Sequence, residues 1–238
     1  MTVNGSGPLD IKLRVPSWVR KGYTVSVNGT AQKIDAKPGT YVTLSRQWRA
    51  GDRIEIAMPF SFRTERALDN PAVQSLFYGP TLLAIQHDVA GQDLASALLS
   101  LSFYRHMKLD GDFAPAMEQG PSANHFTTNN YTLAPFYVAD PAPGAEPPPA
   151  KPYHIYWRRQ EPQVVFGSVD AGVANSARED KLTFLDVVWD QAPFTDHRAF
   201  TAVVTRVAAE WEKAGRFTAQ DRTAVIAAAG KAERELRT

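Results

Sequence analysis

Apolar and polar residues alternate with a period of two through the first 60 residues of the chain. Leu9, Ile11 and Leu13 fall on one face of such a strand, and the charged residues between them fall on the other. The alternation recurs at Val25 with Val27, at Val42 with Leu44, and from Ile54 to Met58, and turn pairs such as Asn28-Gly29 and Pro38-Gly39 separate the stretches. The pattern predicts the half-buried antiparallel strands of a β-sandwich. Asn28-Gly29 predicts a type I′ hairpin turn, because this dipeptide tolerates positive φ at both central positions.

The middle of the chain is more continuously apolar and then irregular. The run from Val73 to Val89, interrupted at Gly79-Pro80, predicts one buried strand with a central bulge or kink. Further strands are predicted at residues 99–104 and 131–138, with an irregular polar stretch over 105–130 between them. Residues 140–152 contain six prolines, which fix φ and remove backbone donors, so this segment is predicted to be a semi-rigid linker.

The last part of the chain changes period. Strands are predicted at residues 153–157, 164–166 and 182–189, and a helix is predicted from the apolar spacing between Phe200 and Trp211. Gly215 fits the end of that helix. Thr218 with Asp221 has the spacing of a capping box for a second helix, whose apolar stripe consists of Val225, Ala229, Ala232 and Leu236. The two helices are expected to form a hairpin that packs on a sheet, with Glu233 and Arg237 as an i, i+4 ion pair.

These elements predict a mainly β chain, with antiparallel β-sandwich modules followed by a small α+β C-terminal region that ends in a helical hairpin. The expected regions are a β-sandwich module over 1–72, a second β-rich module over 73–139, the linker over 140–152 and a C-terminal extension over 153–238.

Composition removes several classes of function. The chain has 26 Lys+Arg against 25 Asp+Glu, a net charge of +1, which lacks the basic excess that nucleic-acid binding requires. It has no run near the roughly 18–20 apolar residues of a membrane span and no signal peptide, so we expect no membrane anchor and a cytoplasmic location if it is expressed as given. The absence of cysteine excludes disulfides, thiolate metal sites and a cysteine nucleophile in this chain.

Motifs for phosphate loops, nucleophile elbows and paired zinc histidines are absent. The histidines lie at positions 87, 106, 125, 154 and 197, too far apart in sequence to suggest a shared metal, and each is interpreted as structural. Asp110-Gly111-Asp112 with Glu118 is similar to the start of a calcium loop, but Phe113 and Ala114 replace the next oxygen ligands, which favours a plain acidic turn. A glycosidase carboxylate pair would have to come from Glu118, Glu161, Asp170, Asp186 and Asp190, each of which also fits a surface or capping role.

Aromatic side chains could bind sugars, because an apolar ring face stacks on the C–H face of a pyranose or furanose. The candidate carbohydrate-binding residues are Trp18, Trp48, Tyr104 and Trp157, and Tyr41 is a further exposed-ring candidate. For each of them the alternative role is packing in the core of the sandwich, where large aromatic residues supply much of the buried area.

Six ordered segments carry a resemblance to a known family. Ile11 to Trp18, Tyr23 to Gly29, Pro38 to Leu44, Trp48 to Asp52, Ile54 to Pro59 and Tyr78 to Leu83 together resemble the β-sandwich that follows the catalytic barrel in the β-L-arabinofuranosidase family, glycoside hydrolase family 127 (GH127). The stretch from Pro152 onwards resembles the C-terminal extension of some relatives. In that family the cysteine nucleophile, the zinc ligands and the acid/base glutamate lie in an (α/α)6 barrel, so the resemblance implies no catalytic residue, zinc site or other cofactor in this chain.

The resemblance implies an accessory β-sandwich portion of a larger hydrolase, from a truncated reading frame or a split gene. Its expected partner is a catalytic barrel domain or the product of a neighbouring gene, and arabinose-containing glycans are possible ligands. A free-standing carbohydrate-binding module is the alternative, and an independent glycosidase with a carboxylate pair is the third. Without a barrel we expect an uncovered apolar face and an unpaired sheet edge, and therefore self-association of the isolated chain.

Overall fold

The structure is a computed structural model that describes residues 1–86, 99–113, 116–120, 122–128, 131–139, 153–159 and 161–237. The chain divides into two compact units. Unit 1 comprises Met1–Ser61 and Tyr78–Pro80, and unit 2 comprises Phe62–Phe77 and Thr81–Thr238. The four regions expected from the sequence stay a prediction, and the proline-rich stretch 140–152 lies outside the described residues.

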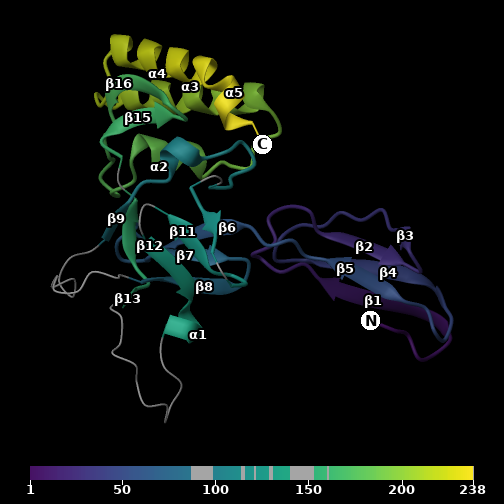
Figure 1. Cartoon of the computed structure of the whole chain (residues 1–238). Coiled ribbons are helices and arrows are strands. Elements are labelled where there is room, and N and C mark those ends of the chain that lie inside the picture. The colour runs from purple at the N-terminus through teal and green to yellow at the C-terminus, as the bar shows by residue number, and fades with distance from the viewer. Residues whose placement is uncertain are drawn as a thin grey trace, which may run out of the picture. The chain divides into compact units, whose positions relative to one another are not determined.

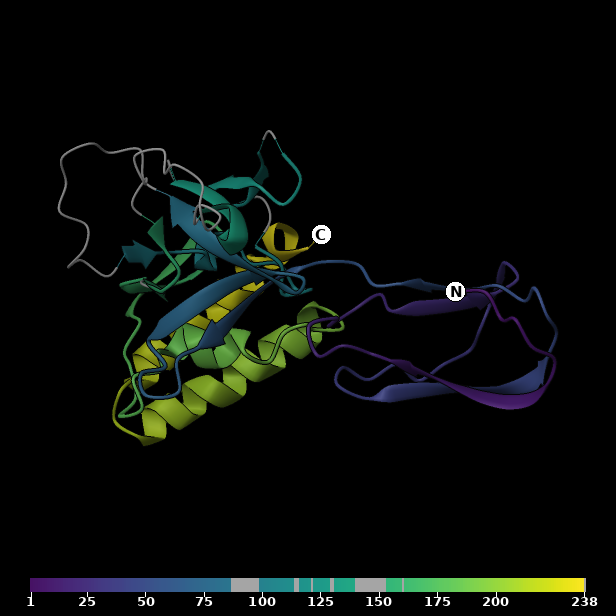
Figure 2. The ribbon, with the colours of Figure 1, turned by 90° about the horizontal axis from the view of Figure 1, so that it is seen from below.

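Unit 1 is a small β-sandwich built from two antiparallel sheets. Strand β1 (Gly7–Arg14) pairs with β4 (Tyr41–Trp48). In the second sheet β2 (Thr24–Val27) lies between β3 (Thr30–Ala31) and β5 (Ile54–Ala57). Figure 2 shows the strands of this unit in two layers.

The core of unit 1 consists of the inward side chains that the alternation predicts. It contains Leu13, Val15, Val19, Tyr23, Val25, Val27, Val42, Leu44, Trp48 and Ile54. Leu9 is an exception. It is 58% exposed although it alternates with buried Leu13.

The hairpin between β2 and β3 confirms the predicted turn. Asn28 and Gly29 have φ of 50° and 80°, and Val27 pairs with Thr30 on either side of them. The Asn28 side chain also donates a hydrogen bond of 2.8 Å to Asp52, so the turn is tied to the loop before β5.

Unit 2 is centred on a nine-stranded sheet. Its path runs β10–β11–β12–β8–β7–β14–β9, with β6 beside β7 and β13 beside β8. The strands are β6 (Phe62–Arg66), β7 (Val73–Tyr78), β8 (Thr81–Gln86), β9 (Leu99–Leu101), β10 (Glu118–Gln119), β11 (Phe126–Thr128), β12 (Tyr131–Pro135), β13 (Tyr153–His154) and β14 (Trp157–Arg159). A 3-10 turn, η1 (Tyr104–His106), follows β9.

Four predictions for this stretch are corrected. The kinked strand expected over 73–89 is two strands, β7 and β8, joined by a turn at Gly79-Pro80, where Gly79 has a φ of 56° that side chains rarely adopt; residues 87–89 of that prediction lie outside the described residues. The strand expected over 99–104 ends at Leu101, and Tyr104 begins η1. The stretch 105–130 contains β10 and β11 in addition to irregular chain. The strand expected over 131–138 ends at Pro135 and continues as the short helix α1 (Phe136–Ala139).

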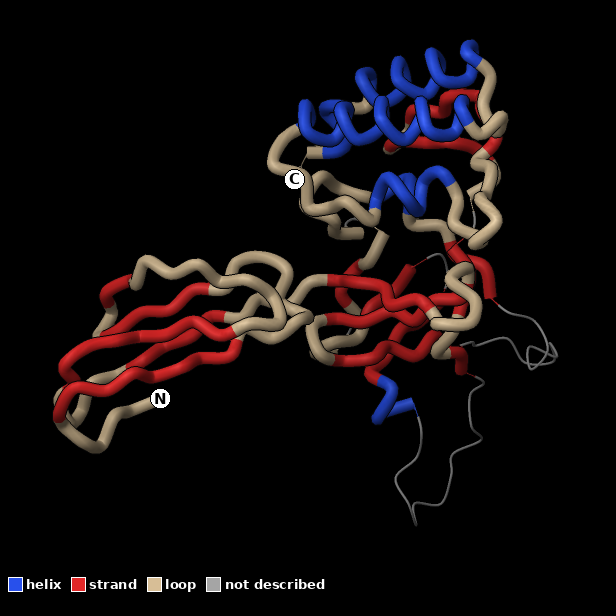
Figure 3. Tube along the Cα trace, turned by 180° about the vertical axis from the view of Figure 1, so that it is seen from behind, coloured by secondary structure: helices blue, strands red, loops and turns tan. Residues whose placement is uncertain are grey.

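The C-terminal part of unit 2 places helices on a two-stranded sheet. Strands β15 (Gln163–Phe166) and β16 (Val169–Ala174) pair with each other. The long helices α3 (His197–Lys213) and α4 (Ala219–Lys231) lie side by side over this hairpin (Figures 1 and 3), and α5 (Glu233–Leu236) follows them. The predicted helical hairpin is confirmed, including positive φ at Gly215 and the capping box at Thr218.

The strand predicted over residues 182–189 is wrong. Residues Phe184–Trp189 form helix α2, and Thr183 caps it in a box in which the Thr183 hydroxyl accepts the Asp186 N–H and the Asp186 carboxylate accepts the Thr183 N–H. Phe184, Leu185 and Val188 are fully buried, the i, i+1, i+4 spacing of one helix face. With these changes the predicted fold class, mainly β with a small C-terminal helical part, is confirmed.

Candidate functional site

Three of the four predicted sugar-stacking rings are buried in the core. Trp48 and Trp157 are each 1% exposed and Tyr104 is 0% exposed, so protein atoms cover both faces of each ring. None of the three can present a ring to a sugar in this fold, which corrects that expectation. Of these four, only Trp18, on the loop between β1 and β2, keeps a partly exposed side chain, and Tyr41, the further candidate on β4, is 57% exposed.

Trp18 belongs to an aromatic cluster of unit 1 formed with Phe60 and Tyr78. The ring centroids of Trp18 and Phe60 are 5.2 Å apart, and those of Phe60 and Tyr78 are 5.5 Å apart, both in edge-to-face geometry. Phe60 remains 41% exposed. The cluster offers an apolar surface that a partner side chain or the C–H face of a sugar could contact.

Glycine makes this cluster possible. A Cβ on Gly79 would lie 2.6 Å from the Phe60 ring, so only glycine allows the ring to approach the turn so closely. Met58, two residues before Phe60, is 39% exposed and Ile56 is 36% exposed. The residues at every second position from Ile56 to Phe60 therefore each leave apolar area uncovered.

Two of the predicted glycosidase acids are brought together by an arginine of unit 2. Arg66 of β6 donates to Asp190 at 2.7 Å and to Asp186 at 3.3 Å. Asp186 also accepts the Tyr104 hydroxyl at 2.6 Å and two bonds from Thr183. Burial alone would lower the pKa of Arg66, but its bonds and charge interactions with Asp190 and Asp186 together raise it, so the guanidinium stays charged.

This buried polar network, formed by Arg66, Tyr104, Thr183, Asp186 and Asp190, joins β6, η1 and α2. The side chain of Asp186 is only 4% exposed and receives four hydrogen bonds. A carboxylate held in this way acts as a structural anchor, because its lone pairs are occupied and its charge is balanced.

The remaining predicted acids lie elsewhere. Glu161 has a 6% exposed side chain that accepts Ser102 at 2.7 Å and Arg105 at 3.2 Å. Glu118 and Asp170 are exposed, and Asp170 caps its own turn through the Gly172 N–H. The structure therefore pairs only Asp186 with Asp190 among the five, and it does so around a cation.

The acidic turn at Asp110-Gly111-Asp112 uses its oxygens locally. Asp110 accepts the Asp112 N–H at 3.0 Å, and Asp112 accepts the Phe113 N–H at 2.8 Å. The turn borders a cavity of about 360 Å³ lined by Leu109, Asp110, Phe194, Thr195, Asp196, His197 and Arg237. His197 lies 2.9 Å from the Ala229 carbonyl, a structural bond, and Asp196 caps α3 by accepting the Ala199 N–H.

Metal-ligating chemistry has little support in the described residues. Within that part of the chain, no group of three or more His, Asp or Glu side chains is placed to hold a metal ion. His87 lies outside the described residues. Because the chain also contains no cysteine, its residues do not fit the thiolate zinc site that the GH127 resemblance places in the barrel.

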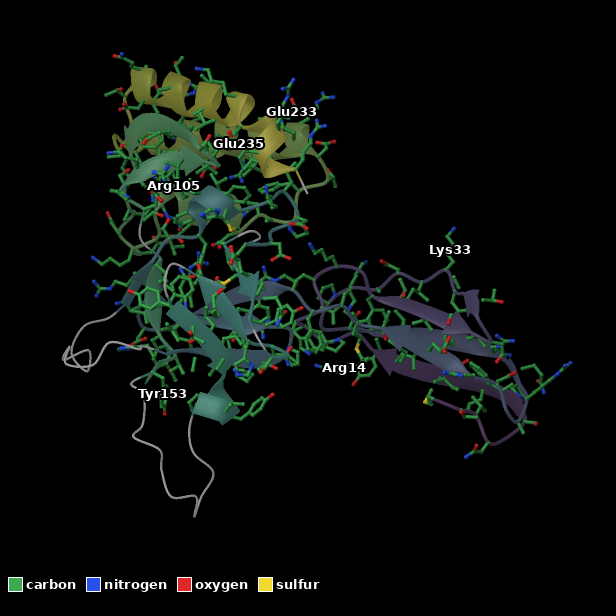
Figure 4. All side chains as sticks on the ribbon, in the orientation of Figure 1. Arg14, Lys33, Arg105, Tyr153, Glu233 and Glu235 are labelled. Atoms are coloured by element: carbon green, nitrogen blue, oxygen red, sulfur yellow. The ribbon has the colours of Figure 1, made fainter. Side chains whose placement is uncertain are left out.

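Two exposed aromatic residues of unit 2 were missed from the sequence. Tyr137 on α1 is 70% exposed and Tyr156 is 51% exposed. Nearby, Phe136 and Tyr153 pack edge to face at 5.9 Å, and Tyr153 lies beside α1 in Figure 4. The sequence could have indicated the exposure of Tyr156, because adjacent side chains of a strand face opposite sides and Trp157 was a candidate core residue.

A comparison with family models decides the relationship of the N-terminal part. Residues 1–60 match the model described as Beta-L-arabinofuranosidase, GH127 middle domain. The resemblance to GH127 is confirmed over this stretch. The matched GH127 region nearly coincides with the first segment of unit 1, Met1–Ser61.

Solved structures give weaker likenesses. They include a protein titled glycoside hydrolase (16% identity, TM-score 0.44), a GH127 β-arabinofuranosidase (18%, 0.43) and a GH127 β-L-arabinofuranosidase from Geobacillus stearothermophilus T6 (19%, 0.41). The alignments cover 65%, 66% and 65% of this chain but only 28%, 28% and 27% of those chains. These scores are too low to establish a common fold, and the chain spans less than a third of the length of each of these structures.

The curated proteins contain no match to the chain. Among the described residues, no helix combines the length and apolar character needed to cross a membrane.

Proposed function

We propose that the chain is a non-catalytic accessory portion of a β-L-arabinofuranosidase-like glycoside hydrolase, and that unit 1 braces an (α/α)6 catalytic barrel. The observation that supports this function is the match of residues 1–60 to the GH127 middle domain, a domain that its description places within a larger enzyme.

The surface of unit 1 supports a bracing role. Ile56, Met58 and Phe60, at every second position of residues 56–60, are each between 36% and 41% exposed. Clustered exposed apolar side chains mark interaction surfaces. Covering the remaining area of each would contribute about 1 kcal/mol, roughly two-fifths of the value for complete burial.

The test is hydrolysis of 4-nitrophenyl β-L-arabinofuranoside by three samples: the full chain, a GH127 catalytic barrel encoded in the same genome, and both together. We expect no turnover by the chain alone, and a higher rate and melting temperature for the barrel when the chain is present. Turnover by the chain alone would contradict the proposal. A barrel whose rate and melting temperature do not change when the chain is added would also contradict it.

A matched pair of variants localises the bracing surface. Phe60→Ser should reduce the effect on the barrel, whereas Leu68→Ser, another apolar-to-serine change at a fully exposed position of unit 2, should leave it unchanged, and circular dichroism checks that both variants fold. Equal effects of the two substitutions would remove unit 1 from the proposed contact.

Exposed aromatic residues favour a second candidate, a carbohydrate-binding module. Tyr137 and Tyr156 of unit 2 and Trp18 of unit 1 present partly or largely uncovered rings. Calorimetric titration with arabinan should then give heat that Tyr137→Ala or Tyr156→Ala lowers. Absence of heat at millimolar sugar, measured on a folded sample, would eliminate this candidate.

A further inference from the structure

One edge of the β1–β4 sheet is open along its length. In the part of the chain that the structure describes, β4 pairs with β1 alone. The Val15 N–H donates to the Thr40 carbonyl at 2.9 Å, in the same register as the β1–β4 ladder. Because hydrogen-bonded pairs alternate in an antiparallel ladder, Val42 and Leu44 bond to β1, and the backbone groups of Thr43, Ser45 and Gln47 point to the other edge.

A hollow of about 460 Å³ runs beside this open edge. Thr43, Leu44, Ser45, Arg46 and Gln47 line it on the side of β4, and Gln32, Lys33 and Ile34 line it on the other. The outward backbone groups of β4 thus border a groove. A groove beside a free strand edge is suited to an extended chain, which binds through main-chain hydrogen bonds.

The opposite edge of the sheet is protected. On β1, Pro8 pairs with Gln47 and therefore occupies an outward-facing position, where it has no N–H to donate. Proline at such a position is a common device against edge pairing. The sequence of β4, Tyr-Val-Thr-Leu-Ser-Arg-Gln-Trp, contains no proline and no acidic residue, so this protection is confined to β1.

The charges at the groove select an acidic occupant. Lys33 is exposed and its side chain extends away from the strands (Figure 4). The Arg46 guanidinium lies 5.1 Å from the centroid of the Trp48 ring, which holds it at the groove. No carboxylate lines the hollow. Two cations without an acidic residue among the lining side chains favour carboxylates on the bound strand.

We propose that the β4 edge binds an extended, acidic polypeptide strand by β-augmentation. The outward groups of Thr43, Ser45 and Gln47 form the ladder, Arg46 contacts an acidic side chain of the added strand, and Lys33 adds positive charge on the opposite side of the groove. The proposal is independent of the GH127 role, because it rests on the register, the hollow and the charges of unit 1.

The test uses the full chain and an acetylated, amidated peptide of sequence Thr-Glu-Val-Glu-Val-Glu-Thr, followed by backbone amide NMR. We expect saturable shifts confined to residues 32–34 and 41–47. A peptide with lysine in place of each glutamate should bind about tenfold more weakly or worse. A peptide with alternate N-methylated amides should not bind, because its pairing edge is blocked.

Protein variants separate backbone pairing from charge. Ser45→Pro removes an outward N–H of β4 and should abolish the shifts, whereas Lys12→Pro makes the same change at an outward position of β1 and should leave them. Circular dichroism checks that both variants fold, and Lys33→Glu tests the charge contribution without touching the backbone.

Four results would overturn the proposal. They are shifts at the β1 edge, the absence of saturation at millimolar peptide, equal binding of the lysine peptide, and retention of binding by a folded Ser45→Pro variant. Concentration-dependent shifts of residues 41–47 without peptide would assign the edge to a second copy of the chain and would also refute it.

Discussion

Replacing Tyr104 by phenylalanine tests whether the carboxylate of Asp186 holds unit 2 together. The change removes one hydroxyl and keeps the ring that fills the core, where Tyr104 is 0% exposed. The lost bond is short, 2.6 Å from the hydroxyl to Asp186 Oδ1, and its acceptor is a buried charge. The substitution therefore isolates one donor of the buried polar network without creating a large cavity.

The expected loss follows from the other donors to Asp186. The carboxylate keeps two hydrogen bonds from Thr183 and one from Arg66, so it remains charged but accepts one hydrogen bond fewer. A hydrogen bond to a charged group contributes about 1.5–3 kcal/mol. We expect Tyr104→Phe to lower the free energy of unfolding of unit 2 by that amount. Asp186→Ala should cost more, because it also removes the capping carboxylate of α2 and one of the two partners of Arg66.

Urea unfolding followed by amide NMR measures the effect for each unit separately. The resonances of Val188 report on unit 2 and those of Val42 on unit 1, since two units need not unfold as one. Tyr23→Phe is the matched control. It deletes the same group from a bond to the neutral Arg14 carbonyl at 3.2 Å, where about 0.5–1.5 kcal/mol is expected.

A Tyr104→Phe loss no larger than that of Tyr23→Phe would show that Asp186 gains little from this hydroxyl. A larger loss at the Val42 resonances, in unit 1, would show that the hydroxyl does not stabilise unit 2. A double-mutant cycle between Tyr104→Phe and Asp186→Asn should show a coupling energy of about 0.5–3 kcal/mol, and additivity within error would show that the two groups do not interact.

Three other predictions concern turns, pH and capping. Gly79→Ala should destabilise unit 1 by about 2–4 kcal/mol, because the added methyl group meets the Phe60 ring and the residue must keep a left-handed backbone conformation. Gly29→Ala adds a methyl group in open space and should cost only about 1–2 kcal/mol. Urea unfolding midpoints compare the two variants, and equal losses would contradict the steric argument. Hydrogen bonds from the Asn28 side chain and the Arg49 backbone N–H lower the pKa of Asp52 from 3.8, so the ionised carboxylate stabilises the fold above pH 3.8 and this stabilisation is lost as the pH falls through the lower pKa of the folded state. The difference in unfolding free energy between wild type and Asp52→Asn should therefore shrink in that range. A constant difference from pH 7 to 2 would argue against this role. Thr218→Ala removes the capping box of α4 and should lower the free energy of unfolding by about 1 kcal/mol in urea unfolding. Thr218→Ser keeps the hydroxyl and should be close to wild type. An equal loss in both variants would mean that the hydroxyl is not the stabilising group.

The sequence was most informative where one physical signal dominated. The type I′ turn at Asn28-Gly29 and the helix started by Thr218 were predictable because local chemistry alone selects them. Helix α2 was missed because a short apolar run fits a strand or a helix equally well. The usable signal there was Thr183 with Asp186, which have the same capping-box spacing as Thr218 with Asp221.

The candidate surfaces were harder to predict, for a different reason. Alternation shows which face of a strand a ring occupies but not whether another layer covers that face. Other parts of the protein cover Trp48 and Trp157 but leave Trp18 partly exposed, and the sequence pattern could not distinguish these cases. The bond between Arg66 and Asp186 joins residues 120 positions apart, and no local pattern encodes such a contact. Period-two reasoning likewise revealed the strands β1 and β4 but not which of their edges stays open.

The position of β14 has a consequence for synthesis of the chain. Trp157 pairs with Gln74 of β7 on one side and with Leu99 of β9 on the other, so the large sheet cannot close until residue 159 has left the ribosome. Unit 1 draws nearly all of its contacts from the first 61 residues and can form much earlier. Nascent chains halted before Trp157 should therefore carry a protease-resistant sandwich joined to strands that proteases still cut.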